Sequence, residues 1–507
     1  MPADLIVTNG RLWPVTTAPR PGAVAVADGR IAALGDADDV LWLRGPSTRV
    51  LDAAGGTVLP GLRDAHIHLF HWALGLERLD LRGLARDEVL AAVAERAATT
   101  ADDDWIEGAG WDHRRIEAPT AAELDAHTGG RPAVLWSQDF HAIWASTAAL
   151  RAAGLGPTTT DPFGGSIVRD RRGDPTGLLL EKATDAMQRA LPGPSPERAD
   201  AALACAQVEM HRRGVVAVDE MASLERHDAY GRAAARGDLR LRVRLMVRAE
   251  RFAAIAGLGL PPGGDGRLTL GGVKVFADGT LGARTAWMLA PYDDRPESIG
   301  IPGVDAGELR TLAVRVARAG LPLVVHAIGD AAVRVALDAV EAAREVDGGR
   351  LTHRIEHAQI VAPADVERFA RLGVVASVQP SHLLTDRDEA VAAWGARTTT
   401  SYAWRTLLDA GVRLAFGSDA PVEPPDPWRA IRAAVLRTEG GRAPFHPEQA
   451  LSLDEAVAAS VAGPLAVGAP ADLVVHAEDL ARSGAVERLD EAGVRATVLG
   501  GEIVHEA

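Results

Sequence analysis

The amino-acid sequence predicts an α/β fold: a (β/α)8 barrel of the TIM type, a small β-sandwich formed by the N- and C-terminal segments, and an insertion after the first barrel strand. Two observations predict this architecture. In the middle of the chain, amphipathic stretches end in glycine and are followed at once by short runs of β-branched residues. At both ends, short β-type runs are separated by turn pairs such as Asn9-Gly10 and Gly500-Gly501.

The junctions from helix to strand supply five of the expected barrel strands. Glycine commonly ends a helix because it adopts the left-handed conformation without strain, and an apolar run follows each of Gly214, Gly237, Gly320, Gly373 and Gly411. Three further strands are interpreted near 58–66, 270–276 and 351–356. Eight strands that alternate with helices favour a closed barrel over an open sheet.

The same pattern predicts the domain boundaries. Residues 1–58 and 461–507 are expected to form the two parts of the β-sandwich, and residues 59–460 the barrel. The segment of about 70–205, between the first and second strands, is far too long for one connection between a strand and its helix. We therefore expect it to be an inserted region.

Composition and charge restrict the classes of function. The 507-residue chain has 47% hydrophobic and 24% charged residues, which is close to the usage of folded proteins. Its 54 basic and 69 acidic residues give a net charge of −15. This balance argues against a nucleic-acid partner or an anionic membrane surface, favours a small-molecule substrate, and leaves a homo-oligomer open.

Cysteine content and hydropathy add two expectations. Cys205 is the single cysteine, so an internal disulfide and a Cys-rich zinc site are excluded and a metal would need histidine and carboxylate ligands. The sequence shows neither a basic N-terminal region followed by an apolar core nor an apolar run of membrane-spanning length. A protein of the reducing cytoplasm is the expectation.

Ionisable residues fall at or near the carboxyl ends of the expected barrel strands. They are His66, His68, Lys274, His326, His357 and Asp419. In a barrel of this type the carboxyl ends of all strands meet at one rim, which carries the active site. Side chains that are far apart in sequence would therefore converge there.

The first histidines and the lysine each have a functional and a plainer interpretation. His66 and His68, two apart on a strand, point to one face and can bind one ion, but they could equally be surface or core histidines. Lys274 would bury a charge in an apolar strand unless its amine is neutralised or pairs with Asp278. Asp64, just before the first histidine, is interpreted as a supporting or structural residue.

The remaining candidates are ambiguous when taken singly. His326 and His357 could be hydrogen-bonded core histidines, and Asp419 could cap the helix that follows it. Because every candidate falls at or near a strand end, core histidines and a helix cap do not account for the set as a whole. The pattern predicts a metal centre at the rim.

These motifs resemble the amidohydrolase superfamily and, within it, amidohydrolase family 3, whose members look like N-substituted formamide deformylases. The resemblance covers nearly the whole chain. It rests on segments 59–68, 110–112, 161–170, 175–177, 273–285, 326–330, 354–359, 379–382 and 416–427. Two places depart from the family pattern, Arg63 where an aliphatic residue is usual and a shortened stretch at 460–470.

The resemblance implies a barrel with a divalent metal, usually zinc, in its mouth. It implies that His66 and His68 hold one ion, that His326 and His357 hold a second, and that carboxylated Lys274 bridges the two. Some relatives work with one metal, so one or two ions are expected, two if the lysine is carboxylated. Carboxylation would replace a buried cation by an anionic oxygen ligand.

The implied reaction is hydrolysis of a C–N bond of the amide or formamide type. A metal lowers the pKa of water towards about 7 and polarises the substrate carbonyl, so that metal-activated hydroxide attacks. Asp419 would bind metal, take the proton and pass it to the leaving atom. The resemblance therefore implies an amidohydrolase that acts on carbon–nitrogen bonds other than peptide bonds.

Five further residues are substrate-binding candidates. Arg284 and His382 are expected to bind substrate or to stabilise the oxyanion, with a surface ion pair and a helix-start histidine as their plainer interpretations. Asp139 and His141, which end a β-like run in the insertion, are expected to reach into the pocket. Trp111 is either a substrate contact or a packing residue.

Two other classes of function compete with hydrolysis. A metal that polarises a carbonyl also acidifies its α-proton, so a lyase or isomerase could use the same pocket. A catalytically idle homologue retained for binding is the third reading. The complete set of six ligand candidates argues against an idle homologue, because such a protein would be expected to have lost metal ligands.

Overall fold

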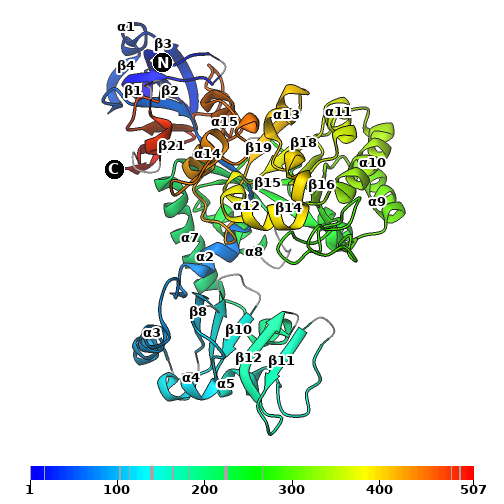
Figure 1. Ribbon diagram of the computed structural model, residues 1–507. Coiled ribbons are helices and arrows are strands. Elements are labelled where there is room, and N and C mark those ends of the chain that lie inside the picture. Colours follow the sequence, from blue (N-terminus) through cyan, green and yellow to red (C-terminus); the bar gives the residue numbers. More distant parts are fainter. Residues whose placement is uncertain are drawn as a thin grey trace. The chain divides into compact units, whose positions relative to one another are not determined.

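The computed structural model describes residues 2–15, 17–101, 104–112, 115–137, 142–162, 165–181, 183–221, 227–264, 266–480, 482, 484–489 and 493–507. Its contacts divide the chain into two compact units (Figure 1). Unit 1 comprises Met1–Phe70 and Ala204–Ala507, and unit 2 comprises His71–Leu203. Each unit is described by itself below.

Unit 1 contains a nearly closed barrel of eight parallel strands, which confirms the α/β barrel. In spatial order the strands are β6 (Leu62–Ile67), β13 (Val215–Glu220), β14 (Arg242–Arg248), β15 (Leu268–Phe276), β16 (Leu323–Ala327), β17 (Arg354–His357), β18 (Val375–Val378) and β19 (Arg413–Phe416). The first and last strands approach closely, because a Cβ atom at Gly417 would lie 2.4 Å from the His66 backbone nitrogen. Glycine is therefore needed where β19 meets β6.

Helices alternate with the barrel strands. They are α8 (His227–Arg236), α9 (Ala306–Arg318), α10 (Asp330–Asp347), α11 (Pro363–Arg371), α12 (Pro380–Trp394), α13 (Trp404–Asp409), α14 (Pro427–Leu436) and α15 (Leu453–Ala458), with short 3-10 turns η2 (Ala249–Leu258), η3 (Gly395–Thr400) and η4 (Pro447–Gln449). In α10, buried Val333, Leu337 and Val340 recur every three or four positions, which places one apolar stripe inward. Asp305 and Asp426 cap α9 and α14 through backbone N–H groups.

Both ends of the chain join one mixed sheet in unit 1. Its order is β22 (Glu502–Glu506), β21 (Val494–Leu499), β20 (Leu473–His476), β5 (Thr57–Pro60), β1 (Ala3–Leu12), β2 (Arg20–Ala27) and β3 (Arg30–Gly35), with β4 (Arg44–Asp52) also pairing with β1. Antiparallel pairing of β20 with β5 links the two ends. The expected sandwich stays a prediction, since these pairings define one sheet.

The strand expected at 58–66 is two strands. β5 pairs in the terminal sheet and β6 in the barrel, and Gly61 lies between them. A Cβ atom there would lie 2.4 Å from the Val216 side chain, so the close approach of β13 requires glycine at the break. The strand expected from 351 likewise begins only at Arg354.

Unit 2 covers most of the segment that the sequence marks as an insertion. Its six-stranded sheet has the order β11 (Gly165–Arg169), β12 (Pro175–Glu181), β10 (Ala142–Ala145), β9 (Ala133–Ser137), β8 (Ile106–Trp111) and β7 (Leu79–Asp80). Its helices are α3 (Arg86–Thr99), α4 (Ala121–Thr128), α5 (Thr147–Ala152) and α6 (Thr184–Ala190). The apolar sides of these elements form the unit's own core, so it is a compact part and not a long loop.

The remaining elements are short or join the parts already described. They are α1 (Ala37–Leu41), η5 (Val486–Arg488), and the two helices in which the chain passes from one unit to the other, α2 (Leu69–Gly75) and α7 (Pro196–Arg212). Among the described helices, none is both long enough and apolar enough to span a bilayer.

Candidate metal centre

Three buried side chains form the nucleus of a metal site at the carboxyl ends of the barrel strands. His66 is near the end of β6, His357 ends β17, and Asp419 follows β19. Each offers one ligand atom, and these atoms all lie within 4.8 Å of one another. Two imidazoles and a carboxylate are ligands that suit zinc and related divalent ions.

His68 adjoins this nucleus through Asp419. The Oδ1 atom of Asp419 lies 3.5 Å from Nε2 of His66 and 3.4 Å from Nε2 of His68. The two rings are 5.9 Å apart between centroids. The two histidines of the first strand therefore face the same carboxylate oxygen, as their spacing predicts.

His326 joins the centre from β16. Its ring centroid is 4.5 Å from that of His357 and 5.1 Å from that of Phe276. Its Nε2–H donates to the Gly279 carbonyl oxygen at 3.0 Å, which leaves Nδ1 as the nitrogen able to bind an ion. Asp278 Oδ1 is a further 3.4 Å neighbour of this Nε2.

Lys274 is buried in β15, where the sequence expects a charge problem. Its Nζ has no hydrogen-bond partner among the described residues and lies 5.1 Å from the Phe276 ring centroid. Burial lowers the pKa of Lys274 to about 8, against the opposing effect of Glu356 and Asp419. Asp278 does not supply the expected pairing, since it accepts N–H bonds from Trp287, Ile328 and Gly329.

Burial keeps the histidines neutral, which is the form that binds metal. It lowers the pKa of His66, lowers that of His326 to about 3 and lowers that of His357 well below its usual value. For Asp419, burial acts in the opposite direction, but His66, His68 and His357 hold its pKa well below the usual range. The carboxylate is therefore ionised beside neutral imidazoles.

Two of the three nucleus residues have backbone conformations that non-glycine residues rarely adopt. The φ angle is +72° at His357 and +58° at Asp419. Such left-handed conformations cost free energy and tend to occur where function requires a particular side-chain direction. Two of the proposed ligands are thus among the described non-glycine residues with a left-handed backbone.

Glu356 fixes the orientation of His66. The Nδ1–H of His66 donates to Glu356 Oε2 at 2.6 Å, which leaves Nε2 free to face Asp419. Although burial alone would raise it, Arg354 and His66 hold the pKa of Glu356 well below its usual value, so this carboxylate only accepts. A carboxylate behind a ligand histidine sets its tautomer and its ring direction.

A layer of buried ion pairs supports this carboxylate from below. The Arg354 guanidinium donates to Glu356 and Asp219 and to the Ala65 carbonyl and Ser377 hydroxyl oxygens. Asp219 also accepts from Arg244 and Arg63. The unusual Arg63 therefore has a structural place in this layer, because its other terminal nitrogen donates to the Ala462 carbonyl oxygen.

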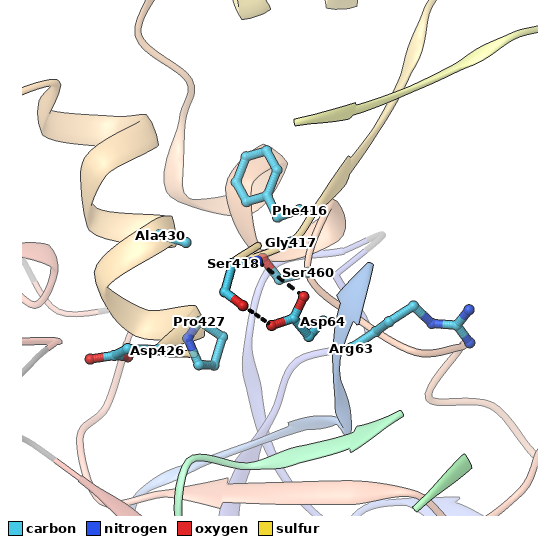
Figure 2. Close-up of a pocket in the computed structure, with 9 residues that line it drawn as sticks. All are labelled: Arg63, Asp64, Phe416, Gly417, Ser418, Asp426, Pro427, Ala430 and Ser460. Carbon is cyan, nitrogen blue, oxygen red and sulfur yellow. Dashed lines mark hydrogen bonds between the residues drawn. The ribbon is translucent and has the colours of Figure 1, made fainter. Parts of the chain in front are cut away.

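Asp64 ties the first strand to the loop that carries Asp419. Its oxygens accept from the Ser418 backbone N–H at 3.0 Å and from the Ser418 hydroxyl at 2.5 Å (Figure 2). They also accept from the His66 backbone N–H at 3.1 Å. Burial raises the pKa of Asp64 to about 7. The cavity beside it measures about 10 Å³, room for about one water molecule, and is too small for substrate.

His382 lies at the edge of the centre. Its ring stacks 6.2 Å from that of His357, and its Nε2 is 3.9 Å from Asp419 Oδ2. That buried nitrogen has no hydrogen-bond partner among the described residues. His382 therefore lies nearest Oδ2 of Asp419, whereas His66 and His68 lie nearest Oδ1.

The other substrate-binding candidates lie elsewhere or outside the described residues. Arg284 forms ion pairs with Asp294 and Glu389, which corresponds to its plainer interpretation. Trp111 is fully buried in the core of unit 2, where its Nε1–H donates to the Leu135 carbonyl oxygen. Both substrate contacts stay predictions, and Asp139 and His141 fall outside the described residues.

Sequence reasoning did not find Glu356, Arg354 and Asp219 as supporting residues. One signal was present, because Arg354 and Glu356 alternate on a short strand that otherwise reads as buried. Charged residues two apart on such a strand must point together into the barrel and need partners there. Which partners they find depends on β13 and β6, which no local pattern reveals.

The barrel and its histidine-rich rim define the class, and comparisons with known proteins define the family. A model described as "Amidohydrolase family" matches residues 49–505. The putative amidohydrolase YtcJ of Bacillus subtilis is 34% identical over 96% of this chain and 96% of its own. The N-substituted formamide deformylase of Arthrobacter pascens is 30% identical over 94% of this chain and 89% of its own.

A solved structure agrees with these sequence relatives. An uncharacterized metal-dependent hydrolase from Pyrococcus horikoshii matches with a TM-score of 0.79 and 28% identity, over 92% of this chain and 96% of that one. The chain belongs to amidohydrolase family 3. It is a hydrolase, and its relatives and its histidine and aspartate cluster indicate a divalent metal.

Proposed function

We propose that this protein hydrolyses a C–N bond of the amide or formamide type in a small molecule, with divalent metal held at the barrel rim. The observation that carries the proposal is the buried trio of His66, His357 and Asp419, whose ligand atoms lie within 4.8 Å of one another. The formamide chemistry follows the activity for which the Arthrobacter relative is named. Zinc fits the donor set best, since nitrogen and oxygen ligands in a compact group suit it.

The remaining candidates define a second position. His326 approaches His357 within 4.5 Å between ring centroids, and the unpartnered Lys274 amine is buried nearby. Carboxylation would turn that amine into an anionic oxygen ligand and would remove the cost of burying it. We propose two ions when Lys274 is carboxylated and one when it is not.

A bound divalent ion would polarise the substrate carbonyl and lower the pKa of attacking water. Asp419 is placed to move the proton. Its Oδ1 faces the histidine pair, while Oδ2 faces His382 and is the atom we assign to receive the proton. From Oδ2 the proton passes to the leaving nitrogen, so the amine departs neutral and no covalent link to the protein is needed.

His382 is proposed to donate a hydrogen bond to the oxygen that gains negative charge during attack. Its buried Nε2 has no partner among the described residues and points toward Asp419. Preorganised donors of this kind stabilise the transition state without having to rearrange.

The test is metal content combined with product release. Purified protein is analysed for metal by mass spectrometry, and formate, amine and ammonia are assayed after incubation with N-substituted formamides and amides. Stoichiometric zinc, together with release of formate and amine from a formamide, supports hydrolysis. Isomerised or eliminated products would instead support the lyase or isomerase alternative, and protein that binds no metal would contradict both.

Variants then locate the centre. His66→Ala should lose bound metal and turnover, whereas His505→Ala, a histidine on β22 in the terminal sheet, should lose neither. Circular dichroism checks that both variants fold. Full activity of a metal-loaded His66→Ala variant would overturn the assignment.

A further inference from the structure

We infer that Arg248, at the carboxyl end of β14, binds a carboxylate carried by the substrate, so that the preferred substrate is a negatively charged amide or formamide. The inference rests on the proposed function for the site but concerns a residue outside the metal ligands. It begins from the strand register. Arg248 pairs with Lys274 of β15, and paired residues of neighbouring parallel strands point to the same face.

That face is the barrel interior. Two residues earlier on β14, buried Met246 packs with Met221 and Val324 of other strands in an interior cluster. Alternation along the strand therefore directs Arg248 to the same side, at the rim where the strand ends. Phe276 is paired with His326 on the next pair of strands and shares this side.

One aromatic ring separates Arg248 from the metal centre. The Arg248 Cζ atom lies 5.4 Å from the Phe276 ring centroid, and the same ring is 5.1 Å from the His326 ring. The half-buried Phe276 contacts the guanidinium through a cation–π interaction, and the Arg248 side chain is exposed to solvent. A molecule whose amide reaches the centre would extend its substituent over this ring.

The other arginines on this side of β14 and just before it form ion pairs, whereas Arg248 has no such pair among the described residues. Arg240 binds Glu502, Arg242 binds Asp472, and Arg244 binds Asp219. In the part of the chain that the structure describes, the exposed Arg248 has no carboxylate or hydrogen-bond partner, and its contact is the Phe276 ring. A chain with 15 more acidic than basic charges thus leaves an arginine unpaired at the rim of its active site.

A carboxylate is the group that fits this donor. The planar guanidinium offers two parallel N–H groups that match the two oxygens of a carboxylate. Such a pair at a partly desolvated rim contributes to binding of the whole substrate and does not touch the reacting bond. It therefore acts on KM more than on kcat.

The test uses two substrates that differ only in the carboxylate, N-formyl-L-phenylalanine and N-formyl-2-phenylethylamine. We expect zinc-loaded protein to favour the first by about tenfold or more in kcat/KM. Arg248→Met should raise KM for N-formylphenylalanine about tenfold with little change in kcat, and should leave the neutral substrate unchanged. Arg248→Lys should recover part of the loss, because it keeps the charge without the fork.

The chain offers a matched control in Arg315 of α9. This arginine is also exposed and lies over a phenylalanine, with its Cζ 5.5 Å from the Phe252 ring centroid, but it is on an outer helix. Arg315→Met should change neither substrate. Equal losses in both variants would show a general charge effect and would overturn the inference.

A binding measurement separates this inference from the proposed function. Calorimetry with 3-phenylpropanoate and its neutral amide needs no turnover, and Arg248→Met should weaken the carboxylate about tenfold and leave the amide unchanged. If neither formamide is hydrolysed, the proposed function fails, yet this loss of binding still supports the anion site. If the formamides are hydrolysed but Arg248→Met alters neither KM nor carboxylate binding, hydrolysis stands and the anion site is overturned.

Discussion

Two neighbouring layers of the barrel interior differ in whether their buried polar groups have hydrogen-bond partners. In the lower layer, Arg354 donates to Glu356, Asp219, a backbone carbonyl and a serine hydroxyl. In the upper layer, Lys274 Nζ, His357 Nδ1 and His382 Nε2 are buried without a hydrogen-bond partner among the described residues. Buried polar groups are normally paired because an unpaired one costs free energy.

This difference separates support from function. The carboxylates of the lower layer, Glu356 and Asp219, both have charged partners within the chain, so this layer holds the strands and orients His66 through Glu356. The upper layer needs groups from outside to complete its bonding, which is the condition for binding a metal and a substrate. The following experiments challenge the contrast, from the largest expected effect to the smallest.

Asp419→Asn should reduce turnover about a thousandfold or more, because an amide cannot accept the proton at Oδ2. The free energy of unfolding of the metal-free protein should change little. Steady-state kinetics on the metal-loaded variant measures the first and urea unfolding of the metal-free variant the second. Retained turnover would place proton transfer on another residue.

Asp219→Asn should destabilise the protein by about 3 to 5 kcal/mol, because it removes the buried carboxylate that pairs with Arg354, Arg63 and Arg244. Lys274→Met, in contrast, removes an unpartnered buried amine and should leave the metal-free protein equally stable or more stable, while turnover falls. Denaturant unfolding of both metal-free variants, with activity measured in parallel, tests the pair. Strong destabilisation by Lys274→Met would show that its amine is paired in the folded protein.

Glu356→Gln should weaken metal binding about 10- to 100-fold, since the amide no longer fixes the His66 tautomer. Competition with a chelator of known affinity measures this loss. Asp365→Asn, at a buried carboxylate that pairs with Arg334 on the outer helices, is the matched control and should leave metal affinity unchanged. Equal affinity in wild type and Glu356→Gln would remove the carboxylate from the site.

His211, a buried histidine away from the centre, has the smallest expected effect on the metal site and changes only how stability depends on pH. Its Nε2–H donates to the Arg240 carbonyl oxygen, and burial lowers its pKa to about 4. The unfolded chain, with a usual value near about 6.5, then binds more protons, so stability is full above that value and falls as pH drops towards 4. The loss reaches about 3 kcal/mol at most, at about 1.4 kcal/mol per pH unit.

His211→Gln keeps a donor for the carbonyl but cannot be protonated. Unfolding of the metal-free variant between pH 7 and 4 should therefore show a shallower slope than wild type, with metal affinity unchanged at neutral pH. Identical slopes in the two proteins would mean that His211 does not titrate differently on folding.

Local pattern predicted the strand ends and the residues on them. His66 and His357 lie at the ends of strands that the sequence predicted, and Asp419 follows the expected last strand. The break at Gly61 was not predicted, because residues 58–66 were interpreted as one strand and divide only where β13 packs against the glycine. Arg284 was expected near substrate, but its partners, Asp294 and Glu389, lie on segments whose approach has no local signal.

The sequence by itself determined the barrel class, the family and the metal-ligand candidates, since periodicity and residue type at strand ends are local properties. Tertiary structure alone decided which polar groups find partners. Glu356 reaches His66 across 290 positions and Arg354 reaches Asp219 across 135, whereas Arg248 at the rim has no ion pair within the described part of the chain. Such pairings depend on how the barrel closes and brings its strands side by side, and no spacing along the chain encodes them.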